Sequence, residues 1–171
     1  MKVLFMGTPD FAVPCLESII KSENNNVIGV VTQPDKPKGR GHKLQPTPVK
    51  AKAVEYNIPV FQPETLKNRS FEDELKQLNP DIIVVVAYGQ ILPEYILNFP
   101  KFGCINVHAS LLPKYRGAAP IQWSIINGDT TTGVTTMYMA KSLDTGDMIR
   151  KAEIQIGDEE SAGELHDRLS L

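Results

Sequence analysis

The sequence predicts an α/β fold built on a doubly wound, mostly parallel β-sheet. Strand-like apolar runs alternate with segments of helical periodicity along the chain. Residues 82–86 read Ile-Ile-Val-Val-Val without a polar interruption, which is typical of a parallel strand buried on both faces. At 171 residues and 42% apolar content, the chain is long enough to bury one sizeable core.

The expected elements follow in chain order. Strands are expected at residues 3–6, 27–31, 60–61, 82–86, 104–108, 132–139 and 148–156. Helices are expected at residues 48–56, 71–78, 120–126 and 161–171, and another one directly after Thr8, which would cap it with Pro9 at its first position. Ser161 is the expected cap of the last helix, which stops without Gly, Pro or a tail. We therefore expect residues 1–171 to form one domain, cut from a longer protein.

Composition excludes several classes of protein. The longest apolar runs fall well short of the roughly 18 residues that a membrane span needs. The N-terminus predicts a first strand and lacks the pattern of a signal peptide, so we expect a cytoplasmic protein. A monomer is the default expectation for its oligomeric state. Cys15 and Cys104 are expected to be small core residues in a reducing compartment. His, Cys and carboxylate residues show no metal-ligand spacing, so we expect no metal.

Positive charge is concentrated between Gln33 and Lys52. This segment holds six basic residues and one acid, a net charge of +5 in a chain whose overall charge is -2. Four prolines and two glycines also lie between residues 33 and 49, which is unusual for an ordinary connection. The pattern favours an arm that grips phosphates, although a solvated loop would have the same composition.

Polar side chains interrupt the expected strand at 104–108, which reads Cys-Ile-Asn-Val-His. Because residues two apart share a face of a strand, Cys104, Asn106 and His108 are expected to point the same way. Ligands of doubly wound sheets bind beyond the carboxyl ends of strands, where Asn106 and His108 would lie. An amide and a protonated imidazole there could stabilise the oxyanion of an acyl transfer. The simpler interpretation is that Asn106 caps a turn and His108 is a buried, hydrogen-bonded histidine.

Asp144 lies between two expected strands, in the run Ser-Leu-Asp-Thr-Gly-Asp. A carboxylate there could orient His108, raise its pKa and relay a proton. Asp and Gly are also ordinary turn formers, so a plain turn is the alternative. The other two histidines, His42 and His166, are expected to be ordinary surface residues.

Six groups of residues resemble the methionyl-tRNA formyltransferase family, from residue 3 to the end of the sequence. They are Met6-Gly7-Thr8-Pro9-Asp10-Phe11-Ala12; Thr32-Gln33-Pro34-Asp35 with Gly39-Arg40-Gly41; Val86-Ala87-Tyr88-Gly89; Asn106-Val107-His108; Ser110-Leu111-Leu112-Pro113 with Arg116-Gly117-Ala118-Ala119-Pro120-Ile121-Gln122; and Leu143-Asp144-Thr145-Gly146-Asp147. The resemblance implies a Rossmann-like formyltransferase catalytic domain. The family also has a C-terminal tRNA-binding domain, for which these 171 residues have no counterpart.

The resemblance implies transfer of a formyl group from 10-formyltetrahydrofolate to the α-amine of methionyl initiator tRNA, for translation initiation. Asn106 and protonated His108 would stabilise the oxyanion, while Asp144 would orient His108 and help to move the proton. The expected folate contacts are Tyr88, Gly89, Ile91, Leu92, Ser110, Leu111, Leu112, Pro113 and Leu143. The expected tRNA contacts are Lys36, Lys38, Arg40 and Lys43 of the basic segment, to which we add Lys114 and Arg116 near the acceptor stem.

Two alternatives stay open. A formyltransferase could use another amine, such as glycinamide ribonucleotide or an amino sugar nucleotide. Glycinamide enzymes hold phosphate with a Gly/Ser-rich first turn, which Gly7-Thr8-Pro9-Asp10 does not resemble, and sugar enzymes would not need the basic segment. A non-catalytic RNA-binding domain would use the basic segment alone, and it would leave Asn106 and His108 unexplained.

Overall fold

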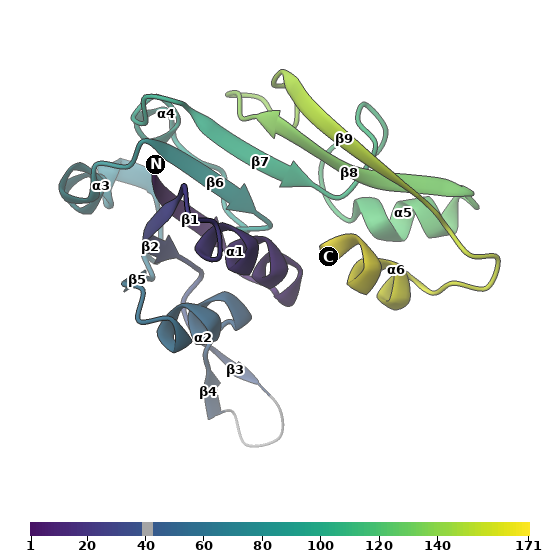
Figure 1. The fold of residues 1–171 in the computed structure, drawn as a ribbon, viewed down its shortest axis with the longest axis horizontal. Helices are drawn as coiled ribbons and strands as arrows, with labels where there is room; N and C mark the ends of the chain where they lie inside the picture. The colour runs from purple at the N-terminus through teal and green to yellow at the C-terminus, as the bar shows by residue number, and fades with distance from the viewer. Residues whose placement is uncertain (39–42) are drawn as a thin grey trace.

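The computed structural model describes residues 1–38 and 43–171, which include a seven-stranded sheet (Figure 1). Five strands run parallel in the order β5-β2-β1-β6-β7, and β8 and β9 extend the β7 edge as antiparallel strands. The doubly wound, mostly parallel sheet is confirmed. The strands are β1 (Lys2–Gly7), β2 (Asn26–Val31), β5 (Val60–Phe61), β6 (Ile82–Val86), β7 (Cys104–His108), β8 (Thr131–Tyr138) and β9 (Met148–Gln155).

Helices cover both faces of this sheet (Figure 1). Side chains of α1 (Val13–Ile20), α2 (Pro48–Glu55), α5 (Pro120–Ile126) and α6 (Ala162–Ser170) share one apolar cluster with the sheet. Side chains of α3 (Glu72–Leu78) and α4 (Glu94–Leu97) share a second cluster on the other face. This double cover explains the uninterrupted apolar run of β6, since both faces of that strand are packed.

Strand β7 presents its residues to alternate faces, as expected. Cys104 belongs to the cluster under α3 and α4, whereas Val107 packs with the cluster under α1, α5 and α6. The Cys104 thiol is buried and donates a weak hydrogen bond to the Ile96 carbonyl at 3.6 Å. Burial raises the pKa of this thiol to about 12, so Cys104 is an inert core residue.

The start of α1 differs from the expectation. The chain forms a 3₁₀ turn at Asp10–Ala12 before α1 begins at Val13, so Thr8 does not cap the helix. The Thr8 hydroxyl instead donates a 2.8 Å hydrogen bond to the carbonyl of Tyr88, which follows β6. The Thr8 hydroxyl therefore bonds a residue far away in sequence and does not cap the helix in the way that the local sequence predicts.

The basic segment contains a short hairpin that the sequence did not predict. Strands β3 (Lys36–Lys38) and β4 (Lys43–Gln45) pair antiparallel, and the hairpin projects from the body beside α2 (Figure 1). Prolines on both sides of the hairpin hide the strand pattern. Two predicted residues of the segment, Arg40 and His42, lie outside the described residues.

The cap of α6 is confirmed. The Ser161 hydroxyl accepts from the Glu164 amide at 3.3 Å, and the Glu164 carboxylate accepts from the Ser161 amide at 2.9 Å. This reciprocal pair satisfies two donors at the helix end. Leu165 and Leu169 are buried against the sheet, so α6 is a packed wall of the domain.

Candidate active site

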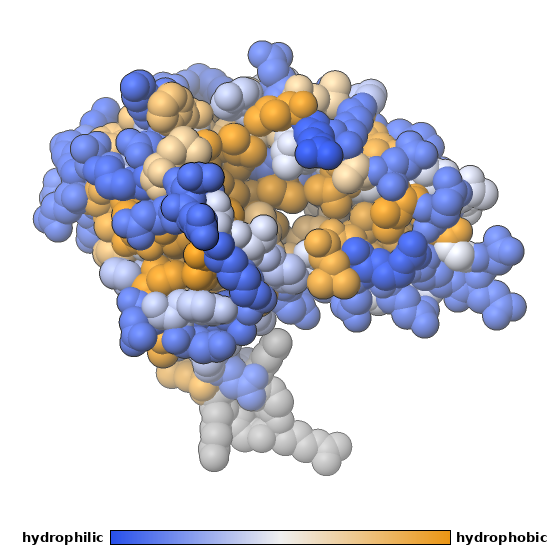
Figure 2. Space-filling view, in the orientation of Figure 1, coloured by the Kyte–Doolittle hydropathy of each residue, from blue (hydrophilic) through white to orange (hydrophobic). Residues whose placement is uncertain are grey.

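A cavity of about 570 Å³ lies at the carboxyl ends of β1, β6 and β7. Strand order reverses between β1 and β6, the position at which doubly wound sheets bind ligands. Residues of the loop after β8, of α5 and of α6 complete the walls. Apolar side chains border a hollow on this face of the molecule (Figure 2). The location agrees with the position expected from the sequence.

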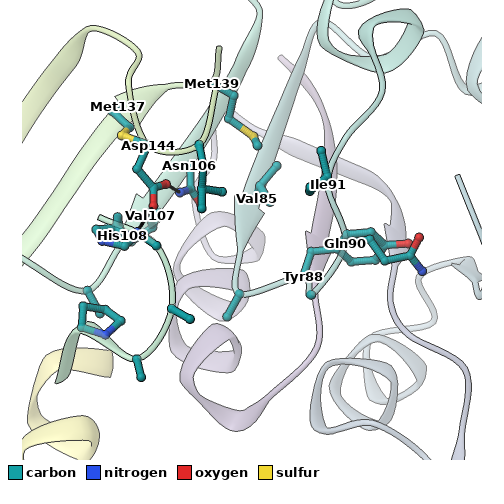
Figure 3. Close-up of a pocket in the computed structure, with 18 of the residues that line it drawn as sticks. Val85, Tyr88, Gln90, Ile91, Asn106, Val107, His108, Met137, Met139 and Asp144 are labelled. Carbon is teal, nitrogen blue, oxygen red and sulfur yellow. Dashed lines mark hydrogen bonds and ion pairs between the residues drawn. The ribbon is translucent and has the colours of Figure 1, made fainter. Parts of the chain in front are cut away.

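Asn106 lies in the middle of the sheet on the cavity side. Its register neighbours are Val85 on β6 and Met137 on β8, and all three residues line the cavity. Apolar neighbours on both sides leave the amide to bond with the loop above it. Asn106 Nδ2 donates to Asp144 Oδ1 at 3.4 Å, so the two side chains face each other (Figure 3).

Asp144 reaches this point from the loop between β8 and β9. Its backbone is left-handed, with φ of 50°, and the residue is buried, with 9% of its surface exposed. The Gly117 amide donates to Asp144 Oδ2 at 2.8 Å. A buried carboxylate needs such donors, because burial without partners would disfavour its charged form.

His108 is the third member of this group, at the end of β7. Its Nδ1 lies 3.7 Å from Asp144 Oδ2, a distance within ion-pair range and beyond an ordinary hydrogen bond. Its Nε2 lies 2.8 Å from the Tyr115 carbonyl. A carbonyl only accepts, so Nε2 carries a proton and Nδ1 is the ring nitrogen that faces Asp144. With 7% of His108 exposed, solvent screens this pair weakly.

Tyr115 holds the imidazole from the side opposite Asp144. Sequence reasoning missed this role, because a main-chain carbonyl has no residue-type signal. The Tyr115 hydroxyl donates to Asp129 Oδ2 at 2.7 Å and accepts from Asn127 at 2.9 Å. Hydrogen bonds from Tyr115, and then from Lys114, hold the pKa of Asp129 below its usual range. The anchored ring fixes the carbonyl that orients His108.

Residues 1–170 match the family model described as Formyl transferase. The chain belongs to the formyl transferase family. Methionyl-tRNA formyltransferases of Alkaliphilus oremlandii and Clostridioides difficile are 66% and 65% identical to it over 169 residues. These matches cover 99% of this chain and 54% of each relative, so the chain spans about half the length of the curated relatives it matches.

Solved structures share the fold of this formyl transferase domain. Phosphoribosylglycinamide formyltransferase from Bacillus halodurans superposes with a TM-score of 0.80 at 22% identity, covering 99% of this chain and 87% of that one. A formyltetrahydrofolate deformylase from Pseudomonas syringae pv. tomato gives 0.76 at 19% identity, covering 99% and 58%. At these identities the likeness concerns the Rossmann-like fold alone.

Five of the nine predicted folate contacts line the cavity. Tyr88, Gln90 and Ile91 lie across the cavity from Asn106, His108 and Asp144 (Figure 3). Burial raises the pKa of Tyr88 to about 12, so its phenol is neutral at physiological pH. Ile91 and Leu143 are 81% and 63% exposed, which makes them apolar lips of the opening. The five residues are Tyr88, Gly89, Ile91, Leu92 and Leu143.

The other four predicted contacts, Ser110, Leu111, Leu112 and Pro113, are not among the lining residues. They form a turn beneath the site. The Thr135 hydroxyl on β8 donates to the Ser110 carbonyl at 2.7 Å and accepts from the Leu112 amide at 3.1 Å. The Ser110 hydroxyl donates to the Lys114 carbonyl at 2.6 Å. This turn supports the chain that leads to Tyr115, and its contact with a ligand stays a prediction.

The predicted tRNA contacts lie in two places. Lys36, Lys38 and Lys43 belong to the β3–β4 hairpin, where Lys36 is exposed. Lys114 and Arg116 are exposed on the segment between β7 and α5, and Lys114 also pairs with Asp129 at 3.1 Å. Two other basic residues of the charged segment form ion pairs with acidic residues of the same chain. Lys50 pairs with Asp35 at 2.6 Å, and Lys52 pairs with Glu17 and Glu55, each at 2.9 Å.

His166 is a cavity residue that the sequence assigned to the surface. It lies on α6, is 28% exposed by its side chain, and lines the cavity together with Phe11. The two rings pack with centroids 5.3 Å apart, and His166 Nε2 lies 3.5 Å from Asp10 Oδ1. Helical periodicity placed His166 beside the buried Leu165, but it could not show that α6 covers the cavity.

No group of three or more His, Cys, Asp or Glu side chains suited to a metal ion occurs among the described residues. Within the same part of the chain, every helix is too short or too polar to cross a membrane.

Proposed function

We propose that this chain transfers a formyl group from 10-formyltetrahydrofolate to the α-amine of methionyl initiator tRNA. One observation carries the proposal: Asn106, His108 and Asp144 converge on a cavity at the sheet reversal. Support also comes from the 66% identity to a methionyl-tRNA formyltransferase over 99% of the chain.

The cavity suits a folate. Its volume of about 570 Å³ lies within the roughly 300–1,000 Å³ common for small-ligand sites. Tyr88, Leu92, Met137 and Met139 supply apolar walls for a flat heterocycle, while Ile91 and Leu143 flank the opening. The Tyr88 hydroxyl is buried without a hydrogen-bond partner among the described residues, which suits a polar group of a ligand.

The three proposed catalytic residues have distinct tasks. When bound, the folate supplies a formyl group on nitrogen, whose carbon the acceptor amine attacks. Negative charge then grows on the formyl oxygen, which the Asn106 amide stabilises as a donor and the protonated His108 ring stabilises through its positive charge. Such a donor is typically worth about 100-fold to 1,000-fold in rate.

Asp144 is suited to handling the proton. Its carboxylate lies 3.7 Å from His108 Nδ1 and faces the cavity in which the amine would react. It can accept the proton that the attacking amine loses, directly or through one water, and deliver it to the folate nitrogen, which leaves as its bond to the formyl carbon breaks. The Gly117 amide keeps the carboxylate aimed at the cavity during these changes of charge.

The choice of tRNA as acceptor is supported by the basic hairpin. Phosphate contacts from basic residues position a nucleic acid without reading its sequence. The likeness to phosphoribosylglycinamide formyltransferases concerns the fold alone and does not favour their acceptor. Because one chain supplies all three proposed catalytic residues, we also propose that the protein acts as a monomer, in the cytoplasm with its tRNA.

A formylation assay that compares three acceptors tests this proposal. Methionyl initiator tRNA, glycinamide ribonucleotide and an amino sugar nucleotide are each incubated with 10-formyltetrahydrofolate and the protein. We expect formylation of the tRNA only. Preferential formylation of either small acceptor would reject the tRNA assignment, and no formylation of any acceptor would reject the enzymatic one.

A further inference from the structure

A polar network at the base of the β3–β4 hairpin has no part in the chemistry described above. Lys50 Nζ donates to Asp35 Oδ2 at 2.6 Å and to Gln62 Oε1 at 2.8 Å. Gln62 Nε2 donates to Asp35 Oδ1 at 2.7 Å and to the Gln33 carbonyl at 2.9 Å. Asp35 directly precedes β3, Lys50 lies in the first turn of α2, and Gln62 follows β5. The network therefore joins both ends of the hairpin segment to the sheet.

Gln62 is the centre of this network. Both amide hydrogens and the amide oxygen have partners, so the side chain uses every polar atom that it has. A glutamate in its place would turn a carboxylate toward both Asp35 and the Gln33 carbonyl. An apolar residue would leave Asp35 with fewer donors. Only an amide satisfies all three neighbours.

The Asp35–Lys50 pair is stronger than an ordinary surface ion pair. Both side chains are only about a quarter exposed, and the carboxylate receives donors on both oxygens. Hydrogen bonds from Lys50, and then from Gln62, hold the pKa of Asp35 below its usual range. The group is therefore charged at physiological pH.

A second link closes the same segment from inside. The Thr32 and Thr47 hydroxyls lie 2.7 Å apart, and Thr47 Oγ1 accepts from the Lys50 amide at 3.1 Å as the cap of α2. Thr32 is fully buried at the end of β2. The end of β2, which precedes the hairpin, and the start of α2, which follows it, are thus joined to each other.

The network also reaches the rim of the cavity. Gln33 Nε2 donates to the Tyr88 carbonyl at 3.3 Å, and the Thr8 hydroxyl donates to the same carbonyl at 2.8 Å. The Gln33 amide donates to Thr8 Oγ1 at 3.4 Å. One continuous set of contacts therefore connects the base of the hairpin with the turn that carries Tyr88.

We propose that Asp35, Lys50 and Gln62 are positioning residues that fix the base of the β3–β4 hairpin relative to the cavity. The inference rests on the proposed function, because the hairpin is taken to contact the phosphates of the tRNA acceptor. An arm fixed at its base presents its charges in one orientation, so it loses less conformational entropy when a polyanion binds. The network should thus act on tRNA recognition and leave the chemical step alone.

Gln62→Glu in the intact protein tests the proposal, with Gln77→Glu on the exposed face of α3 as a control that makes the same charge change. We expect Gln62→Glu to raise the KM for methionyl-tRNA about tenfold, the effect of losing one hydrogen bond to a charged group. Both kcat and the KM for the folate should stay within about twofold. Lys50→Arg keeps the charge and the donors, so its KM for tRNA should stay close to that of the parent.

Amide hydrogen exchange gives a readout that needs no substrate. Strands β3 and β4 should exchange faster in Gln62→Glu than in the parent or in Gln77→Glu, while β6 and β7 should be unchanged. Unchanged hairpin exchange in Gln62→Glu would overturn the inference. A lower kcat together with higher KM values for both substrates, as a general structural defect would give, would overturn it too. If the parent fails to formylate methionyl-tRNA, the proposed function fails, yet the exchange experiment still decides whether the network fixes the hairpin.

Discussion

The main-chain amide of Gly117 donates a 2.8 Å hydrogen bond to the carboxylate of Asp144. The two residues come from different loops, before α5 and between β8 and β9. Gly117 has a φ of +88°, a conformation that favours glycine. The bond therefore depends on two local backbone shapes, and it sets the carboxylate beside Asn106 and His108.

Removing the side chain of Asp144 or of Asn106 should slow the reaction strongly while leaving tRNA binding intact. Asp144→Ala and Asn106→Ala are each expected to lower the formylation rate about 100-fold or more, because they remove the proton acceptor or an oxyanion donor. Single-turnover formylation measures the rate, and filter binding measures tRNA affinity. Asp147→Ala, which removes an exposed carboxylate of the same loop, is the control. Near-parent turnover in both variants would contradict the catalytic assignment.

Gly146→Ala should displace Asp144 without touching it. A Cβ at Gly146 would lie 1.8 Å from the Tyr138 carbonyl oxygen, far inside van der Waals contact, so the loop must move away from β8. We expect formylation to fall about 100-fold, as for loss of the carboxylate itself. Gly163→Ala is the matched control, since its Cβ would meet nothing closer than 3.9 Å. A crystal structure with Asp144 unmoved in Gly146→Ala would refute the steric explanation.

Thr135→Val should destabilise the fold. The Thr135 side chain is fully buried, and its hydroxyl bonds the Ser110 carbonyl and the Leu112 amide. Valine leaves both main-chain groups unpaired, which should lower the free energy of unfolding by about 1–3 kcal/mol. Urea denaturation checks this value. Thr136→Val, whose hydroxyl makes a 3.4 Å contact with the Arg150 carbonyl, should change it much less; equal losses in both variants would contradict the role of the buried hydroxyl.

The anchor of Tyr115 should depend on pH. Hydrogen bonds from Tyr115 and then Lys114 lower the pKa of folded Asp129, so its stabilising contribution is present above the unfolded pKa of about 3.9. It is lost as pH falls through the lower, folded pKa. The difference in unfolding free energy between the parent and Asp129→Asn should therefore be larger at neutral pH than in strong acid. Asp158→Asn, at an exposed position, serves as the control. A difference that does not shrink in acid would argue against this linkage.

Arg40→Ala tests the tRNA contact that the family resemblance implies. The change removes a positive charge that the resemblance assigns to phosphate contact, so we expect a higher KM for methionyl-tRNA and an unchanged KM for the folate. Steady-state kinetics with each substrate varied in turn measures both constants. Val54→Ala, at an exposed apolar position of α2, controls for a general surface effect. Unchanged kinetics on charged tRNA would reject the role of Arg40.

The elements that follow from local sequence were predictable. The apolar runs of β1, β2, β6 and β7 and the Ser161 cap of α6 each have a signal within a few residues. The convergence of Asn106 and His108 also followed from the period of a strand. Asp144 was a candidate because of its position between two strands, although its spacing alone could not exclude a plain turn.

Other features depend on contacts that a local pattern does not carry. Thr8 has the right residue type for a helix cap, but its hydroxyl bonds Tyr88, eighty residues away in sequence. His166 faces the cavity because α6 docks beside Phe11, a packing event that helical periodicity leaves open. The Tyr115 carbonyl orients His108 as a main-chain group, so its identity as Tyr says nothing of that task.

The packing of α6 against Phe11 has a consequence for the growing polypeptide. During synthesis the strands β1 and β6 emerge early, whereas α6 with His166 follows all three proposed catalytic residues in the sequence. A nascent chain that lacks α6 has the proposed catalytic residues but one wall of their cavity is missing. Ligand binding should therefore arise only after α6 has left the ribosome, and a chain that ends before α6 would not withdraw folate from the free pool.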